Sequence, residues 1–225
     1  MKFIATLALS LLLAGTVNAG TAAGAIRGAA ERSADWLIRQ FDLKKGTFDS
    51  ATAPETVAMA IKALCGHPRD YKEANGPYIT MPVKFMLSKI DDKGHVDGAQ
   101  INEAEAIQWI ITALKATKND TYAPVIERLR NRVKELGKPD FPKFEASHLT
   151  PAAVAPDSMR NAIAAVLHAA EEGKKEIEVD GKQVKWAELL GPSVVKLQQP
   201  DGSFGSDIQT NAMALVVLDL CLKGL

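Results

Sequence analysis

The segment Asp91-Asp92-Lys93-Gly94-His95-Val96-Asp97 is the first place where this chain could bind a metal ion. Its candidate ligands are the carboxylates of Asp91, Asp92 and Asp97 and the imidazole of His95, groups that bind hard divalent cations. The spacing is not that of a calcium-binding loop. Solvated side chains in a turn explain the same residues, so a turn is the preferred interpretation and a metal site the alternative.

Carboxylates also recur where the apolar helices of the chain are predicted to begin. A facing pair of them could hydrolyse a glycan by acid–base catalysis. The candidates are Glu55, Glu103, Glu105, Asp157 and Asp207. Acidic residues at a helix start also cap its free N–H groups and offset its dipole. Capping is therefore preferred, with catalysis as the alternative.

The remaining reactive residues match no catalytic motif. The histidines His67, His148 and His168 are scattered, and no phosphate-binding loop, serine elbow or zinc spacing is found, so no cofactor is predicted. Trp109 stands among apolar neighbours in a predicted helix, where core packing is the usual role. The alternative is that Trp109 lines a ligand pocket.

Two cysteines are too few for a disulfide framework. Cys65 and Cys221 each lie near the end of a predicted apolar helix, which favours two buried free thiols. An exported protein could instead join them in one disulfide between the beginning and the end of the fold.

The first residues resemble a signal peptide. Met1-Lys2 provides a positive start, residues 3–14 are almost wholly apolar, and Val17-Asn18-Ala19 ends on a small residue. We expect cleavage after about Ala19 and a location in the periplasm or outside the cell. The apolar stretch is too short for a stable membrane span, and no later segment approaches the required length, so no integral membrane segment is expected after cleavage.

Residues 20–225 are enough for one domain with a hydrophobic core. The chain has 27 basic and 27 acidic residues, without a basic stripe. This balance gives no support for nucleic acid or an anionic membrane as a partner.

An internal repeat accounts for most of these residues. Residues 56–64 match 210–218 without a gap, residues 55–64 match 105–114, and residues 161–167 match 211–217. The copies lie at about 25–66, 77–117, 120–171 and 184–223, with a period typical of helix-pair repeats.

Each copy pairs an amphipathic helix with a helix that is apolar all round. The amphipathic helix keeps one face in water, whereas the apolar helix must be surrounded by protein. Gly46, Gly94 and Gly202 follow the amphipathic helices, and each has a large apolar residue two positions later. Glycine there can adopt the left-handed conformation of a tight turn. Ahead of the fourth copy, residues 177–184 alternate about Asp180-Gly181, which predicts a small β-hairpin.

The segment Gln198-Gln199-Pro200-Asp201-Gly202-Ser203-Phe204-Gly205 resembles the repeat of terpenoid cyclases and protein prenyltransferases. That repeat has a glutamine near the end of the outer helix, a glycine turn, and Trp or Phe two residues after the glycine. The resemblance implies an all-α fold, an α/α toroid of the prenyltransferase/squalene-oxidase type. Complete toroids of this kind use more helix pairs than four, so the expectation is an open arc or a small closed ring.

The chain departs from that family where catalysis is concerned. The Asp-rich acid motif of the cyclases, the zinc ligands of the prenyltransferases and the thioester motif of complement-type toroids are not found. The resemblance therefore predicts the fold of this chain but not a catalytic activity. The first functional hypothesis is an exported non-catalytic protein that presents a toroid rim or an axial cavity to a protein, a glycan or an apolar, isoprenoid-like ligand. The alternative is a small enzyme, cyclase-like or polysaccharide-cleaving, that uses the rim carboxylates.

Overall fold

The computed structural model describes residues 19–49, 51–137, 175–179 and 182–224, and this part of the chain is mostly helical. It contains seven α-helices and two short antiparallel strand pairs. The predicted helical class is confirmed. The predicted hairpin near 177–184 is also confirmed, because β3 (Glu176–Val179) pairs with β4 (Lys182–Lys185). The second strand pair, β1 (Phe41–Asp42) with β2 (Thr47–Phe48), was not predicted and surrounds the first glycine turn.

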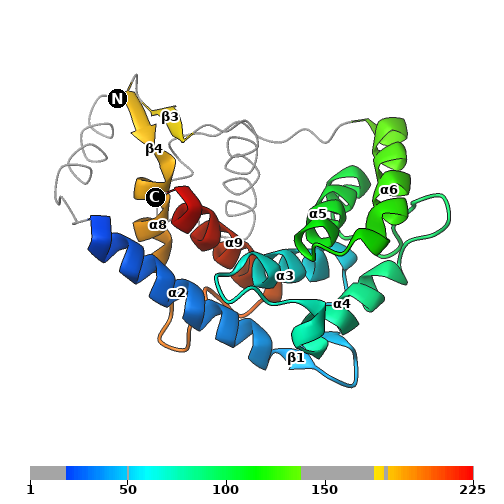
Figure 1. Cartoon of the computed structure of the whole chain (residues 1–225), viewed down its shortest axis with the longest axis horizontal. Helices are drawn as coiled ribbons and strands as arrows, with labels where there is room; N and C mark the ends of the chain where they lie inside the picture. The colour runs from blue at the N-terminus through cyan, green and yellow to red at the C-terminus, as the bar shows by residue number, and fades with distance from the viewer. Residues whose placement is uncertain (1–18, 50, 138–174, 180–181, 225) are drawn as a thin grey trace.

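Three helices form the inner layer of the described fold (Figure 1). They are α3 (Pro54–Gly66), α5 (Glu103–Ala116) and α9 (Ile208–Gly224), and α3 packs between the other two. Beyond their first turns these helices are largely buried, as their apolar sequences require. No described helix has the length and apolar character needed to cross a membrane.

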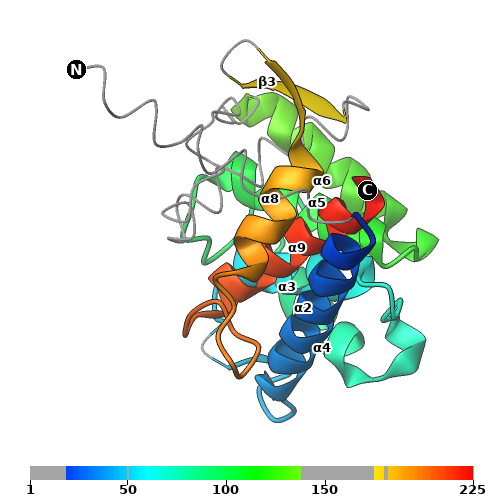
Figure 2. The ribbon, with the colours of Figure 1, turned by 90° about the vertical axis from the view of Figure 1, so that its left-hand side faces the viewer.

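Four helices pack on the outside of this layer. α4 (Pro77–Leu87) covers α3, α6 (Ala123–Leu136) covers α5, and α2 (Ala19–Arg39) and α8 (Trp186–Val195) lie together on α9 (Figures 1 and 2). The short 3₁₀ turns η1 (Glu73–Asn75) and η2 (Asp120–Tyr122) precede α4 and α6. The last helix thus packs against the first helix pair, so the two ends of the described fold meet.

The outer helices bury one stripe each. In α2 the buried residues include Ile26, Ala30 and Leu37, at the spacing expected from the sequence. In α6 only Leu129 is fully buried, and Leu136 is exposed. α8 begins at Trp186 and includes Pro192 in its interior. The apolar half of the third copy, together with Asp157, lies outside the described residues.

The three predicted glycine turns are present. Gly46, Gly94 and Gly202 have φ angles of 71°, 83° and 93°, in the left-handed region that favours glycine. The residues two positions later, Phe48, Val96 and Phe204, are all buried. At Gly202 a side chain is excluded by contact as well, because a Cβ there would lie 2.6 Å from the carbonyl oxygen of Arg32.

Gln198 connects the glycine turn of the fourth copy, at Gly202, to α2. Its Nε2 donates to the carbonyl oxygens of Ala29 at 2.8 Å and Gly202 at 3.0 Å, and its Oε1 accepts from Nε of Arg32 at 3.0 Å. The backbone N–H of Phe204 donates to Oδ1 of Asn211 at 2.7 Å, which fixes the turn to the first residues of α9. The residues that carry the sequence resemblance therefore join the last repeat to the first.

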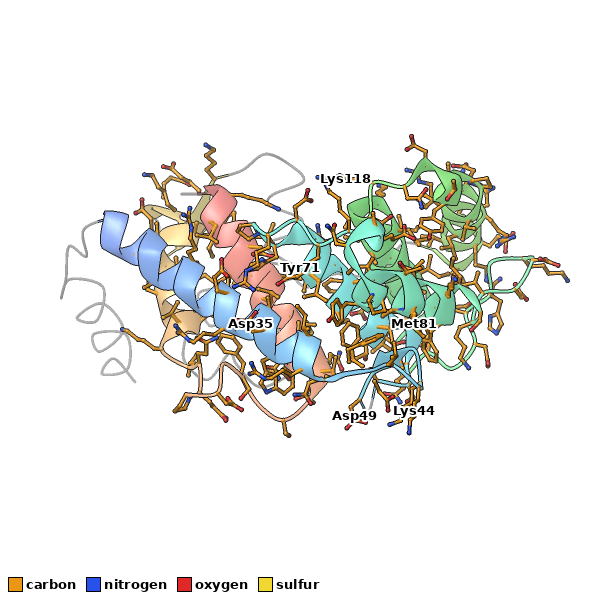
Figure 3. All side chains as sticks on the ribbon, turned by 60° about the horizontal axis from the view of Figure 1, so that its bottom comes forward. Asp35, Lys44, Asp49, Tyr71, Met81 and Lys118 are labelled. Carbon is orange, nitrogen blue, oxygen red and sulfur yellow. The ribbon has the colours of Figure 1, made fainter. Side chains whose placement is uncertain are left out.

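Charged contacts on the surface also connect α2 to the segment that follows α3 (Figure 3). Arg69 donates from Nη1 to Oδ1 of Asp35 at 2.6 Å and to the hydroxyl of Tyr71 at 3.1 Å, and it also pairs with Glu31. These side chains are partly exposed, so we expect each pair to contribute little to stability.

Candidate functional site, a polar stripe on the inner helices

The acidic segment predicted as a possible metal site is a turn between α4 and α5. The carboxylate of Asp91 accepts hydrogen bonds from the backbone N–H groups of Lys93 and His95, both at 2.8 Å. Both hydrogen bonds lower the pKa of Asp91, and the one from His95 has the larger effect. Asp92 is exposed to solvent. Asp91 is therefore occupied in closing its own turn.

The other two candidate ligands point to different partners. Nδ1 of His95 lies 2.7 Å from Oε1 of Glu103, whereas Oδ2 of Asp97 lies 4.0 Å from Nζ of Lys89. In the described part of the chain, no three His, Cys, Asp or Glu side chains are grouped so that they could hold a metal ion. The structure thus does not bring the four predicted ligands together.

Glu103, one of the predicted rim acids, binds α6. Arg132 donates from Nε to its Oε1 at 3.2 Å and from Nη2 to its Oε2 at 3.1 Å, a two-point contact between guanidinium and carboxylate. Burial raises the pKa of Glu103, but the hydrogen bonds from Arg132 and His95 outweigh it and hold the pKa below its usual value. Glu103 therefore connects α5 to the outer helix that covers it.

Asp207 caps α9, as its position predicted. Its Oδ1 accepts from the backbone N–H of Thr210 at 2.7 Å, and its carbonyl oxygen accepts from Nδ2 of Asn211 at 2.8 Å. A side-chain acceptor at this place satisfies an N–H group that the helix itself leaves free.

Glu55 is the most unusual of the predicted acids. It is 1% exposed at the start of α3, and its Oε1 accepts from the backbone N–H of Gln100 at 2.8 Å. Its Oε2 is buried without a hydrogen-bond partner. Burial raises the pKa of Glu55, and the negative charge of Glu105 adds to the effect. In this conformation Glu55 fastens the loop before α5 and is out of reach of a substrate.

Trp109 is part of the hydrophobic core. It is 5% exposed on α5, and Trp36 and Trp186 are buried to a similar degree. None of the three tryptophans therefore presents an open ring face on which a sugar could stack.

Several polar residues of the inner helices share one stripe, which the sequence analysis missed. Position 55 of α3 is equivalent in the repeat to position 105 of α5 and position 209 of α9. Steps of three, four and three residues from each of these give positions 55, 58, 62 and 65 in α3, 105, 108, 112 and 115 in α5, and 209, 212, 216 and 219 in α9. Residues with this spacing lie on one face of a helix. We call this face the inner-helix stripe; its polar members are Glu55, Lys62, Cys65, Glu105, Gln108, Thr112, Lys115, Gln209 and Asp219. Aligning the repeats one turn further would have revealed it.

Charges on the stripe act across neighbouring helices. Glu105 of α5 influences Glu55 of α3, and Lys62 of α3 influences Asp219 of α9. Burial lowers the pKa of Lys62, and the like charge of Lys223 lowers it further. The stripes of adjacent inner helices therefore lie within electrostatic reach of one another.

The two cysteines are free and buried, as the preferred interpretation predicted. Burial raises the pKa of both Cys65 and Cys221 to about 12. Thiols with such a pKa remain protonated near neutral pH, so neither is suited to act as a nucleophile.

Comparison of the chain with protein-family models, with curated proteins and with solved structures gives no match in any of the three. The arrangement of the described side chains is therefore the basis for a functional proposal.

Proposed function

We propose that this chain is an exported, non-catalytic repeat protein of the α/α-toroid type that binds a polar segment of another polypeptide along the inner-helix stripe. The observation that carries the proposal is the stripe itself. Each inner helix has polar side chains on this face, and in α5 all four positions are polar. Three of these, Gln108, Thr112 and Lys115, reach the surface. Packing alone gives no reason for such a pattern.

The packing of the helices supports a toroid or an arc. α9 returns to pack on α2 and α3, and the amphipathic helices lie outside the apolar ones. In a toroid, equivalent positions of successive inner helices face a common axis. The part of the stripe that reaches the surface, on α5, would then line that axis, which is where we place the bound segment.

The chemistry of the stripe favours a polypeptide over a sugar or an isoprenoid. Glu105 and Lys115 carry opposite charges on one helix. Between them lie the amide of Gln108 and the hydroxyl of Thr112, which donates to the carbonyl oxygen of Gln108 and keeps its oxygen as an acceptor. A peptide can complement both charges and hydrogen bonds. The buried tryptophans provide no stacking surface for a sugar, and the large exposed apolar side chains in the described residues are Leu43 and Leu136 alone.

The engagement of the rim acids supports a role without catalysis. Glu55 holds a loop, Glu103 binds Arg132, and Asp207 caps α9. General acid–base catalysis requires carboxyl groups within hydrogen-bonding reach of a substrate. Glu55 and Glu103 instead join neighbouring segments of the fold, and Asp207 caps its own helix.

Site-specific photocrosslinking in the cells that produce the protein tests the proposal. A photoreactive residue at position 108 on the stripe should capture a defined partner, whereas one at Lys84, exposed on the outer helix α4, should not. The partner should be lost when Lys115→Glu is added to the position-108 probe and kept when Lys84→Glu is added. A set of captured proteins that is the same in all these variants would refute binding along the stripe.

The enzymatic alternative has its own test. Polysaccharide turnover that disappears in the double variant Glu55→Gln/Glu105→Gln, with the thermal unfolding midpoint retained, would replace the binding proposal with a hydrolase.

A further inference from the structure

Asp219 is buried in the interface between α9 and α3, where the last repeat meets the first. Its side chain is 4% exposed, and neither carboxylate oxygen has a hydrogen-bond partner. On the α3 side it lies against Gly66, since a Cβ built on that glycine would be 3.3 Å from Oδ2. A charged carboxylate without hydrogen bonds is costly to bury, so this position favours the protonated acid.

Two lysines are the charged groups that act on Asp219 among the described residues. Lys62 comes from α3, and Lys223 comes from α9 itself. The other two helices on α9, α2 and α8, contribute no charge that acts on the carboxyl group within the described part of the chain. Both lysines favour ionisation, but desolvation has the larger effect and raises the pKa of Asp219 to about 7.

We propose that Asp219 is a pH-sensitive latch of the α3–α9 interface, closed when the carboxyl group is protonated and opened by its ionisation. The two oxygens are inaccessible to solvent in the closed form, so the group is not a ligand site there. An ionised Asp219 gains water or a lysine partner when α9 shifts away from α3. The inner-helix stripe includes Asp219, so opening of the latch would also change the stripe.

The direction of the pH dependence follows from proton linkage. The carboxyl group has a pKa near the ordinary value of 3.8 when the interface is open and about 7 when it is closed. The closed form binds the proton more tightly, so the stability of the closed interface is highest below pH 3.8. It falls as the pH rises towards 7 and changes little above that.

Hydrogen–deuterium exchange of the full-length protein tests the latch. The exchange rates of amides in residues 212–220 are compared between wild type and Asp219→Asn at the same pH, which removes the intrinsic pH dependence of exchange. Asparagine keeps the shape of the side chain and cannot ionise. The ratio of wild-type to variant rates should rise between pH 5 and 7, by up to about tenfold per pH unit, and then level off. A ratio that stays constant with pH would overturn the proposal.

Two further variants make the result specific. Glu135→Gln removes an exposed carboxylate on α6 and should leave the wild-type pH profile unchanged. Lys62→Met removes a positive charge that favours ionisation of Asp219. The pH above which the exchange rates stop rising should therefore be higher in this variant than in the wild type. The ratio of Lys62→Met to wild-type exchange rates at each pH needs no Asp219 variant, so a ratio that stays constant with pH would contradict the latch even if Asp219→Asn failed to fold. The latch requires no ligand, so its failure would leave the binding proposal standing.

Discussion

Replacing Gly202 by alanine should destabilise the protein strongly, because two separate costs meet at this turn. The backbone has a φ of 93°, which an L-residue adopts at a cost of about 1–2 kcal/mol. The added Cβ would also lie 2.6 Å from the carbonyl oxygen and 2.9 Å from the carbonyl carbon of Arg32. Relieving such a contact moves the backbone of α2 and costs a further 1–3 kcal/mol, roughly. The sum is a large part of the total stability of an ordinary domain.

Gly98 provides a matched control for the strain alone. It has a φ of 77°, and a Cβ built on it meets nothing within 4 Å. Gly98→Ala should therefore cost only about 1–2 kcal/mol. Urea unfolding followed by circular dichroism gives both free energies of unfolding, and the difference between the variants isolates the contact with Arg32. If Gly202→Ala lost no more stability than Gly98→Ala, the close approach of the turn to α2 would be refuted.

Three further predictions concern contacts between the repeats. Gln198→Ala should cost about 1–3 kcal/mol, because it removes the donor to the carbonyl oxygen of Gly202 and the bonds to α2, whereas Gln199→Ala on the exposed side of the turn should cost much less in the same urea assay. Glu103→Gln should flatten the acid side of the stability–pH curve. The pKa of Glu103 is lowered by folding, so its contribution is present above the unfolded pKa and lost as the pH falls through the folded one. Cys65 and Cys221 should resist Ellman's reagent in the folded protein and react in urea, and a reductant should leave the melting temperature unchanged; a thiol count of zero in urea would contradict two free thiols.

The features that the sequence predicted best are those with a local cause. A glycine after an amphipathic helix and an apolar residue two positions later require only a left-handed turn and a nearby core, and Gly202 and Phe204 follow this rule. The cap formed by Asp207 is local as well. The β1–β2 pair around Gly46 was missed because its strands have two residues each, too few for an alternating pattern.

The candidate site was predicted less well because it depends on contacts between distant segments. The bond from Gln100 to Glu55 and the pairing of Glu103 with Arg132 arise only when α3, α5 and α6 pack together. No spacing in the sequence indicates either contact. Asp219 lies just beyond the apolar run 212–218, and its burial becomes evident only once α9 is seen against α3.

The return of α9 to the first helix pair has a consequence for the order in which the chain becomes stable during synthesis. Until residues 208–224 have left the ribosome, the sides of α2 and α3 that pack on α9 are uncovered. Contacts between segments so far apart in sequence form late and raise the barrier to folding. A nascent chain would therefore stay incompletely folded until α9 is made. A chain truncated before Ile208 should expose apolar surface and aggregate or be degraded by proteases.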